Sequence, residues 1–178
     1  PWRNRGKDWA TLFKTGDSID VQLGGNPDAD PERRDPVVGD LRLLIAPMDG
    51  EPVAVLYRPK LPEDQAGHEQ TFSSPWRNVT FDDVQRLEAA KIAVRVHNDY
   101  YEVEAAVPWS TLGLSNPAGR TLRGDLGAIF SDRDGTLNLL RSYWSNRATG
   151  LVNDVPGEAM LTPRLWGTLK FQLAETNE

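Results

Sequence analysis

The chain has 178 residues, of which 39% are hydrophobic and 26% are charged, a balance that is typical of one globular domain. Its apolar runs are far shorter than the roughly 20 residues of a membrane-spanning helix, so we expect no membrane span. The net charge is −6 and the basic residues are scattered, which argues against nucleic acid and anionic lipid as partners. The absence of cysteine excludes disulfides, thiolate metal sites and cysteine nucleophiles.

Apolar and polar residues alternate through most of the chain, with the two-residue period of a β-strand. The alternation first appears in residues 18–23, where the apolar side chains share one face. Residues 40–47 and 52–58 follow, separated by a Met-Asp-Gly sequence, and Asp-Gly between apolar runs is a strong hairpin signal. We therefore expect a strand at 18–23 and an antiparallel hairpin over residues 40–58.

The second half of the chain predicts another hairpin, formed by residues 91–97 and 101–107. Helix is expected in two short pieces only: residues 81–89, with Thr80 as the N-cap, and one turn at 109–112. Further strands are expected at residues 125–131, 137–144 and 167–173.

Short strands joined mostly by local hairpins indicate an all-β fold. Because helices this short cannot cover a sheet, we expect an antiparallel, jelly-roll-like β-sandwich, with residues 1–178 forming a single domain. Two polar loops, residues 24–39 and 59–74, are long enough to bind a partner.

Three segments occur in an order and spacing that resemble a known family. They are residues 16–21 (GDSIDV), residues 101–113 (YEVEAAVPWSTLG), and a late group at 124–127, 132–135, 143–145 and 163–167. Together they resemble the family 9 carbohydrate-binding modules and their DOMON-like relatives. The resemblance implies noncatalytic binding of a saccharide or a polysaccharide chain end. It also implies a module of a larger secreted protein, located in the extracellular space or the periplasm.

The start of the chain departs from this family. Its members usually have several strands before the segment that resembles residues 16–21, whereas only 16 residues precede Asp17 here. We therefore expect a domain that is incomplete on its N-terminal side. Other domains, or another chain, would supply the missing strands, because a sandwich without them leaves open sheet edges.

The tryptophans divide into structural and ligand-binding candidates. Trp109 and Trp166 lie inside the segments that carry the resemblance, so we expect both to be structural. The other four lie in polar segments, where a large apolar ring needs a reason to be present, and are Trp2, Trp9, Trp76 and Trp144. The family clamps a terminal sugar between two aromatic rings, and Trp9, with Phe13 as its alternative, and Trp144 hold comparable positions. The alternative for Trp144 is a residue at the rim of the core.

Polar side chains are expected around that clamp. Asp17 and Asp20 project from the polar side of the first strand and Arg42 from a neighbouring strand, while Asn146 follows Trp144 closely. Their planar groups could hydrogen-bond sugar hydroxyls. An ordinary Asp–Arg pair across two strands on a solvated face is the alternative.

A calcium site is a further hypothesis. Asp132 and Asp134 stand two residues apart just before Gly135, a spacing that resembles the start of a calcium loop. A plain β-turn explains the same residues. Asp28 and Asp30 are the alternative donors for a structural Ca²⁺.

Two other functions compete with sugar binding. A b-type haem electron-transfer domain would take its axial ligands from His68, His97, Met48 and Met160. A structural module that docks partner domains would turn its exposed tryptophans toward protein. No catalytic sequence motif is present, so we do not expect an enzyme.

Overall fold

The computed structural model describes residues 2–150 and 153–172. Strand accounts for 41% and helix for 8% of the chain, and every strand pairing is antiparallel, so the all-β prediction is confirmed. The strands are β1 (Ser18–Gly24), β2 (Asp40–Met48), β3 (Glu51–Arg58), β4 (Gln70–Ser73), β5 (Asn78–Phe81), β6 (Asp83–Arg86), β7 (Lys91–Val96), β8 (Tyr101–Ala106), β9 (Thr121–Ser131), β10 (Asn138–Tyr143) and β11 (Gly167–Lys170). The helices are η1 (Trp9–Lys14), α1 (Val155–Ala159) and η2 (Pro163–Leu165).

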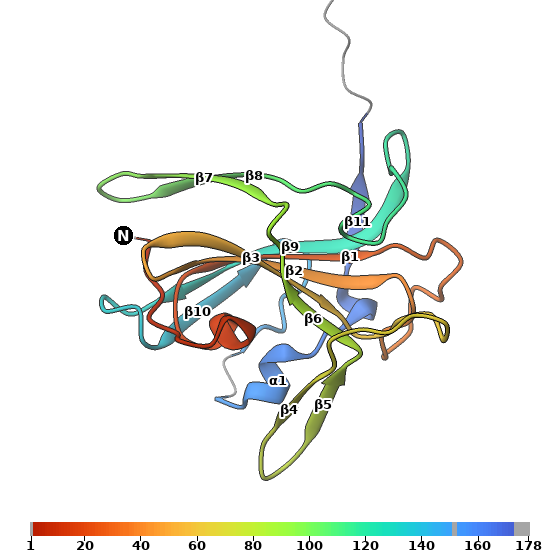
Figure 1. Cartoon of the computed structure of the whole chain (residues 1–178), viewed down its shortest axis with the longest axis horizontal. Helices are drawn as coiled ribbons and strands as arrows, with labels where there is room; N and C mark the ends of the chain where they lie inside the picture. The colour runs from red at the N-terminus through yellow and green to blue at the C-terminus, as the bar shows by residue number, and fades with distance from the viewer. Residues whose placement is uncertain (1, 151–152, 173–178) are drawn as a thin grey trace, which may run out of the picture.

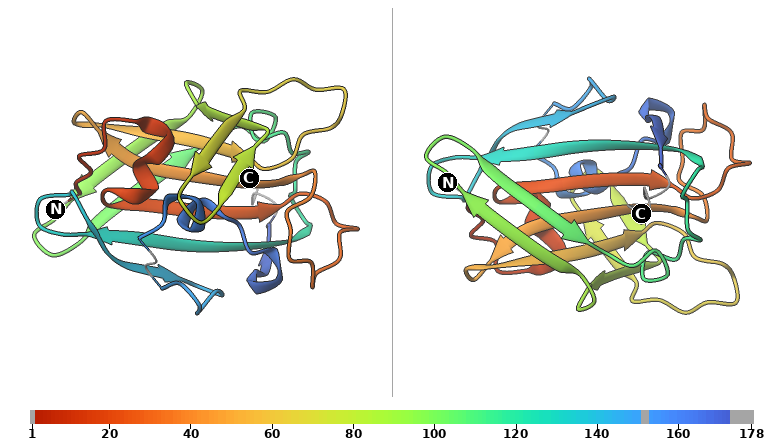
Figure 2. Two further views of the ribbon diagram at one scale, coloured as in Figure 1. Left: turned by 90° about the horizontal axis from the view of Figure 1, so that it is seen from below. Right: turned by 90° about the horizontal axis from the view of Figure 1, so that it is seen from above.

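A seven-stranded sheet forms the centre of the fold, in the order β10-β9-β1-β2-β3-β6, with β11 also paired to β9 (Figure 1). The β7–β8 hairpin lies over one face of this sheet, which we call the upper face, as drawn in Figure 1. Helices η1 and α1 and the β4–β5 hairpin lie on the opposite, lower face (Figures 1 and 2). The sandwich therefore has unequal layers, and the described strands do not divide into the two sheets of an eight-stranded jelly roll.

Alternation along the strands produces a core on each face. Leu23, Leu43 and Leu56 belong to the upper core, against which Val103 and Trp109 also pack. The lower core is built from the residues that alternate with these, together with side chains from η1 and the β4–β5 hairpin; it includes Leu44, Val55, Tyr57, Phe13 and Phe72. Both cores share the central sheet, which is why its middle strands are buried on both sides.

Both hairpins predicted from the sequence are confirmed. In the first, β2 pairs with β3, and Asp49 and Gly50 at its turn have φ of 52° and 89°. Positive φ at both central positions is what a tight hairpin turn requires, and Asp-Gly supplies it at low steric cost. In the second, β7 pairs with β8.

The helix predicted at residues 81–89 is wrong. Phe81 ends β5, and residues 83–86 form β6, an edge strand of the central sheet in which Val84 pairs with Tyr57. Pairing with β3 and burial of Phe81 and Val84 in the lower core outweigh the local helical signal. Thr80 does not cap a helix, since its hydroxyl is 2.8 Å from that of Thr71 across the β4–β5 hairpin.

Asp83 fixes β6 to the rest of the fold. Its carboxylate accepts hydrogen bonds from the Arg58 guanidinium at 2.7 and 2.9 Å and from the His68 backbone N–H at 2.9 Å. Burial alone would raise the pKa of this carboxyl, but these hydrogen bonds together outweigh burial and lower the pKa. The charged form is therefore the one that the folded state favours.

Replacing Asp83 by asparagine is expected to lower the free energy of unfolding at pH 7 by roughly 1.5–3 kcal/mol, because hydrogen bonds to a charged acceptor are lost. A lowered pKa in the folded state stabilises above the unfolded value of about 3.9, and this contribution is lost as the pH falls through the lowered pKa. Urea unfolding of both proteins at pH 7 and near pH 3 should show a difference that shrinks in acid. Glu88→Gln, at an exposed carboxylate, is the control. An Asp83→Asn difference that is independent of pH would contradict this account.

No helix in the described part of the chain is long and apolar enough to cross a membrane.

Candidate functional site

Asp20 and Arg42, predicted to bind a ligand, form an ion pair inside the protein. The Arg42 guanidinium donates to both carboxylate oxygens of Asp20, at 3.0 and 2.7 Å, and both side chains are almost fully buried. Helix α1 covers the pair, and Arg42 also donates to the backbone oxygen of Glu158 at 3.1 Å. The Tyr143 hydroxyl donates to Asp20 as well. Their hydrogen-bonding groups are therefore directed toward other parts of the protein.

The surroundings fix the charges of this cluster. Burial alone would lower the pKa of Arg42, but the negative charge of Asp20, its hydrogen bonds and the nearby Tyr143 and Tyr57 together outweigh burial and raise the pKa, so the guanidinium stays charged. Burial and the nearby Asp20 charge raise the pKa of Tyr143, which keeps its phenol protonated as a hydrogen-bond donor. The Arg42 guanidinium also lies 4.7 Å above the centre of the Phe13 ring.

Asp17, a third predicted ligand-binding residue, is also buried and serves as a structural anchor. Its carboxylate accepts from the backbone N–H of Arg3 and from that of Ser131, both at 2.8 Å. These contacts fasten the N-terminal segment to the end of β9. The structure thus separates Asp17 from the Asp20–Arg42 pair.

The two rings of the predicted clamp, Trp9 and Trp144, are not brought together. Trp9 packs against the lower core beside Ala10, whose backbone oxygen accepts from Tyr57 on β3. Trp144 donates its backbone N–H to Leu126 on β9. Strands β1 and β2 lie between β3 and β9, and three strand spacings amount to about 14 Å. Each ring therefore has different neighbours.

Trp144 remains half exposed, at 53%. A side chain on Gly167 would collide with the Trp144 ring, so the backbone of β11 covers part of the ring. Trp109 packs edge-on against Phe171 and Trp166 is buried, with its indole N–H donating to Gln22 at 2.8 Å. The structural roles predicted for Trp109 and Trp166 are consistent with these contacts.

The most exposed large apolar side chain among the described residues is Trp76, at 77%. It lies in the turn between β4 and β5, which the Ser74 N–H closes by donating to the Arg77 oxygen at 2.9 Å. The Ser74 hydroxyl accepts from the backbone N–H groups of Trp76 and Arg77, both at 3.3 Å. Arg77 in turn pairs with Asp154, the N-cap of α1, at 3.2 Å. This turn therefore presents the indole from a fixed backbone.

Trp76 borders a hollow of about 520 Å³ on the lower side of the molecule, which we call the Trp76 hollow. Polar groups that can donate or accept hydrogen bonds share its wall with apolar ones. Its lining includes Arg34, Asp35, Lys60, Arg77, Asn78 and Met160. An aromatic face beside guanidinium, amide and carboxylate groups is chemically suited to a ligand with both C–H faces and hydroxyls.

A second, smaller hollow of about 140 Å³ adjoins the first, because Met160 lines both. Its wall carries Gln22, Arg141, Tyr143 and the predicted site residue Asn146. The Asn146 backbone N–H donates to Asp125 at 2.8 Å and its side-chain oxygen accepts from Ala148 at 2.9 Å, so its position is well fixed.

Backbone groups engage Asp132, one of the two predicted metal residues. The Asp132 carboxylate accepts from the backbone N–H groups of Thr136 and Leu137, at 2.7 and 3.2 Å, and these contacts lower its pKa. Such contacts are those of a turn. No group of three or more acidic, His or Cys side chains placed to hold a metal occurs in residues 2–150 and 153–172, so Ca²⁺ at Asp132 and Asp134 stays a prediction.

The two histidines proposed as haem ligands have different partners. His68 lies 3.2 Å from the Asp83 carboxylate, whereas His97 lies 3.0 Å from Glu102 and stacks on Tyr100. Their contacts give no support to a shared axial site.

The chain matches no family model, no curated protein and no solved structure. The resemblance to family 9 carbohydrate-binding modules therefore stays a prediction carried by the quoted segments.

Proposed function

We propose that this chain binds a saccharide without catalysis, and that the Trp76 hollow is the contact surface. The observation that supports this most is Trp76 itself, a large ring exposed at 77% on a fixed turn beside a polar hollow. Exposure of such a ring to water is unfavourable unless a partner covers it. A pyranose offers an apolar face for the ring and hydroxyls for Arg77 and Asn78.

The charges around the hollow favour a binding role over hydrolysis. Glycoside hydrolysis normally requires two carboxyl groups on either side of the scissile bond. Of the described residues that line the Trp76 hollow, Asp35 is the only acid. Two cations of the hollow are paired, Arg77 with Asp154 at 3.2 Å and Lys60 with Asp82 at 3.6 Å, which favours a neutral saccharide over an acidic one. As the resemblance implies, we further propose that the domain is a module of a secreted protein.

A glycan array probed with the 178-residue chain tests this function. We expect retention on at least one neutral oligosaccharide or polysaccharide end, with competition by the same glycan in solution. Absence of binding across plant, algal, microbial and animal glycans would contradict the proposal.

Trp144 is the second candidate platform. For glycans long enough to reach it, Trp144→Ala is expected to weaken binding by about 1–3 kcal/mol while the fold survives. Calorimetry with the best array glycan, run beside a thermal melt, measures both properties. Unchanged affinity in a folded variant would exclude Trp144 from the contact, and an unfolded variant would place it in the core.

A further inference from the structure

The upper layer of the sandwich ends at an open strand edge. Strand β8 pairs only with β7, so its other side has no strand partner among the described residues. The His97 N–H donates to the Tyr100 oxygen at the hairpin turn, so these two residues form a hydrogen-bonded pair. Hydrogen-bonded and non-hydrogen-bonded pairs alternate along an antiparallel ladder, and every second residue of β8 therefore turns its backbone groups away from β7. The backbone N–H and C=O groups of Tyr101, Val103 and Ala105 therefore point toward the open edge.

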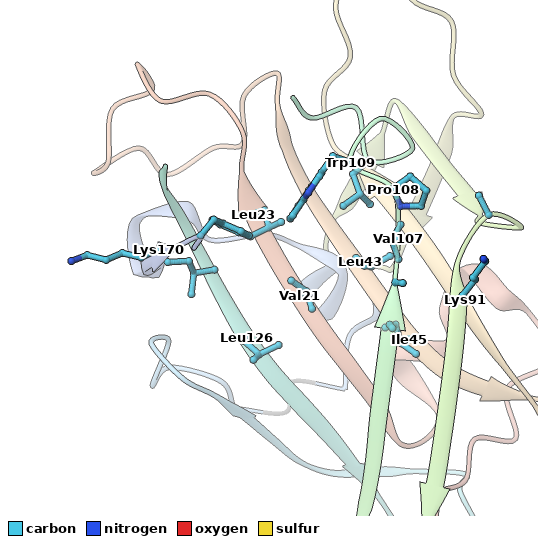
Figure 3. Close-up of a pocket in the computed structure, with 16 residues that line it drawn as sticks. Val21, Leu23, Leu43, Ile45, Lys91, Val107, Pro108, Trp109, Leu126 and Lys170 are labelled. Atoms are coloured by element: carbon cyan, nitrogen blue, oxygen red, sulfur yellow. The ribbon is translucent and has the colours of Figure 1, made fainter. Parts of the chain in front are cut away.

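An apolar groove runs beside this edge. It has a volume of about 790 Å³ and lies between the β7–β8 hairpin and strands β1, β2, β9 and β11, with Lys91 and Lys170 also in its lining (Figure 3). Val21 and Leu126 form part of its floor, and Val107 and Trp109 lie on the side of β8. A second hollow of about 530 Å³, lined by Tyr101 and other residues, continues along the start of β8.

Apolar side chains of the central sheet remain uncovered here. Leu126 is 50% exposed and Phe130 is 40% exposed, and both lie on β9 facing the upper side. A strand placed beside β8 would cover them and pair the open backbone groups at the same time. A small apolar ligand would cover the side chains but would leave the backbone groups without partners.

The charges of β8 specify what kind of strand fits. On its outer face, Glu102 pairs with Arg95 at 3.4 Å, whereas Glu104 lies opposite Ala93 and has no cationic partner among the described residues. If β8 paired with β8 of a second copy, the outer faces of the two strands would lie on the same side of the joined sheet. Glutamates would then lie opposite glutamates. Basic residues on the outer face of the added strand would complement these charges instead.

From these observations we infer that β8 is a docking edge for an extended segment of another polypeptide. This segment alternates apolar residues, which enter the groove, with basic residues that face Glu102 and Glu104. Recognition of this kind adds a strand to an existing sheet: the backbone supplies hydrogen bonds and the alternating side chains supply specificity. The surface lies across the central sheet from the Trp76 hollow and does not depend on the proposed sugar binding.

The test uses a synthetic seven-residue peptide that alternates valine with lysine, titrated into the 178-residue chain by calorimetry. We expect saturable binding, and slower hydrogen exchange at the amides of Tyr101, Val103 and Ala105 in the complex. The same peptide with glutamate in place of lysine, or with its residues in scrambled order, should bind at least about tenfold more weakly, since like charges or a broken alternation then meet β8.

Val103→Pro is the informative variant. It removes one N–H that points toward the open edge and leaves the ladder with β7 intact, so the peptide affinity should fall about tenfold. Val94→Pro is the matched control, because Val94 is the cross-strand neighbour of Val103 and its N–H points to the opposite edge of the hairpin.

Four results would overturn the inference. They are no binding of the valine–lysine peptide, equal binding of the glutamate peptide, equal losses in both proline variants, and self-association of the chain through β8. If Val103→Pro fails to fold, the exchange rates of the three edge amides in the unaltered chain decide the question.

Discussion

Asp20→Asn is expected to lower the free energy of unfolding by about 3–5 kcal/mol, the cost of leaving one partner of a buried ion pair without its counter-charge. Asp20 accepts two hydrogen bonds from Arg42 and a third from Tyr143, and no solvent reaches the pair to replace them. The Arg42 guanidinium cannot escape the penalty by losing its proton, because an arginine side chain stays protonated in proteins. Urea unfolding at pH 7 measures the loss.

Two further variants separate the cost of an unpaired buried charge from a general loss of stability on mutation. A double variant, Asp20→Leu with Arg42→Met, removes both charges and should be more stable than Asp20→Asn alone. Glu102→Gln breaks the exposed pair with Arg95 and should change stability by less than about 1 kcal/mol. A loss below about 1 kcal/mol in Asp20→Asn would show that the pair is hydrated in solution.

Trp76→Ala is expected to weaken saccharide binding by at least about 2 kcal/mol, or roughly 30-fold in affinity, because the indole is the largest apolar surface available to the ligand. The fold should survive, since the ring is 77% exposed and the turn that carries it is closed by backbone and Ser74 contacts. Calorimetry with the best array glycan and a thermal melt report the two effects separately.

Tyr100→Ala supplies the matched control for that experiment. Tyr100 is also an exposed aromatic residue at a hairpin turn, at 56%, but it lies between β7 and β8 on the upper side. Its removal should leave saccharide affinity unchanged. Equal losses in Trp76→Ala and Tyr100→Ala would point to nonspecific stacking.

Alternation of residue types predicted much of the sheet. Strand β1 and the two hairpins lie where the two-residue period placed them, and Asp20 and Arg42 do share one face of the sheet. Alternation cannot show whether a polar face is open to solvent. Here the cover is α1, whose Glu158 contacts Arg42 across 116 positions of sequence. The predicted sugar-binding pair is for that reason an internal one.

Pairing between strands that are distant in the sequence also explains the largest error in the predicted secondary structure. Residues 81–89 carry local helical signals, yet the open edge of β3 and the space in the lower core decide their conformation. The polar loop predicted at residues 59–74 likewise ends in β4, a strand stabilised by pairing with β5.

The sequence predicted only part of the candidate site. Polar neighbours marked four tryptophans as exposed candidates, and of these Trp76 and Trp144 are exposed, whereas Trp2 and Trp9 pack against the upper and lower cores. The residues beside a ring in the sequence do not show which other segments cover it. Placing Trp76 beside Arg34 and Met160 requires the three-dimensional fold, since these residues come from separate loops. The distance between Trp9 and Trp144 likewise depends on the order of strands in the sheet.

The most direct test of the proposed function is a titration of ¹⁵N-labelled protein with the best array glycan, followed by NMR. The six tryptophans give separate indole N–H signals, so the spectrum reports which rings the ligand touches. We predict saturable shifts at the indole of Trp76 and at the amides of Arg77, Asn78 and Met160, with the indole of Trp109 unaffected. Shifts confined to Trp109 and the upper groove, or no shift with any glycan, would contradict the account.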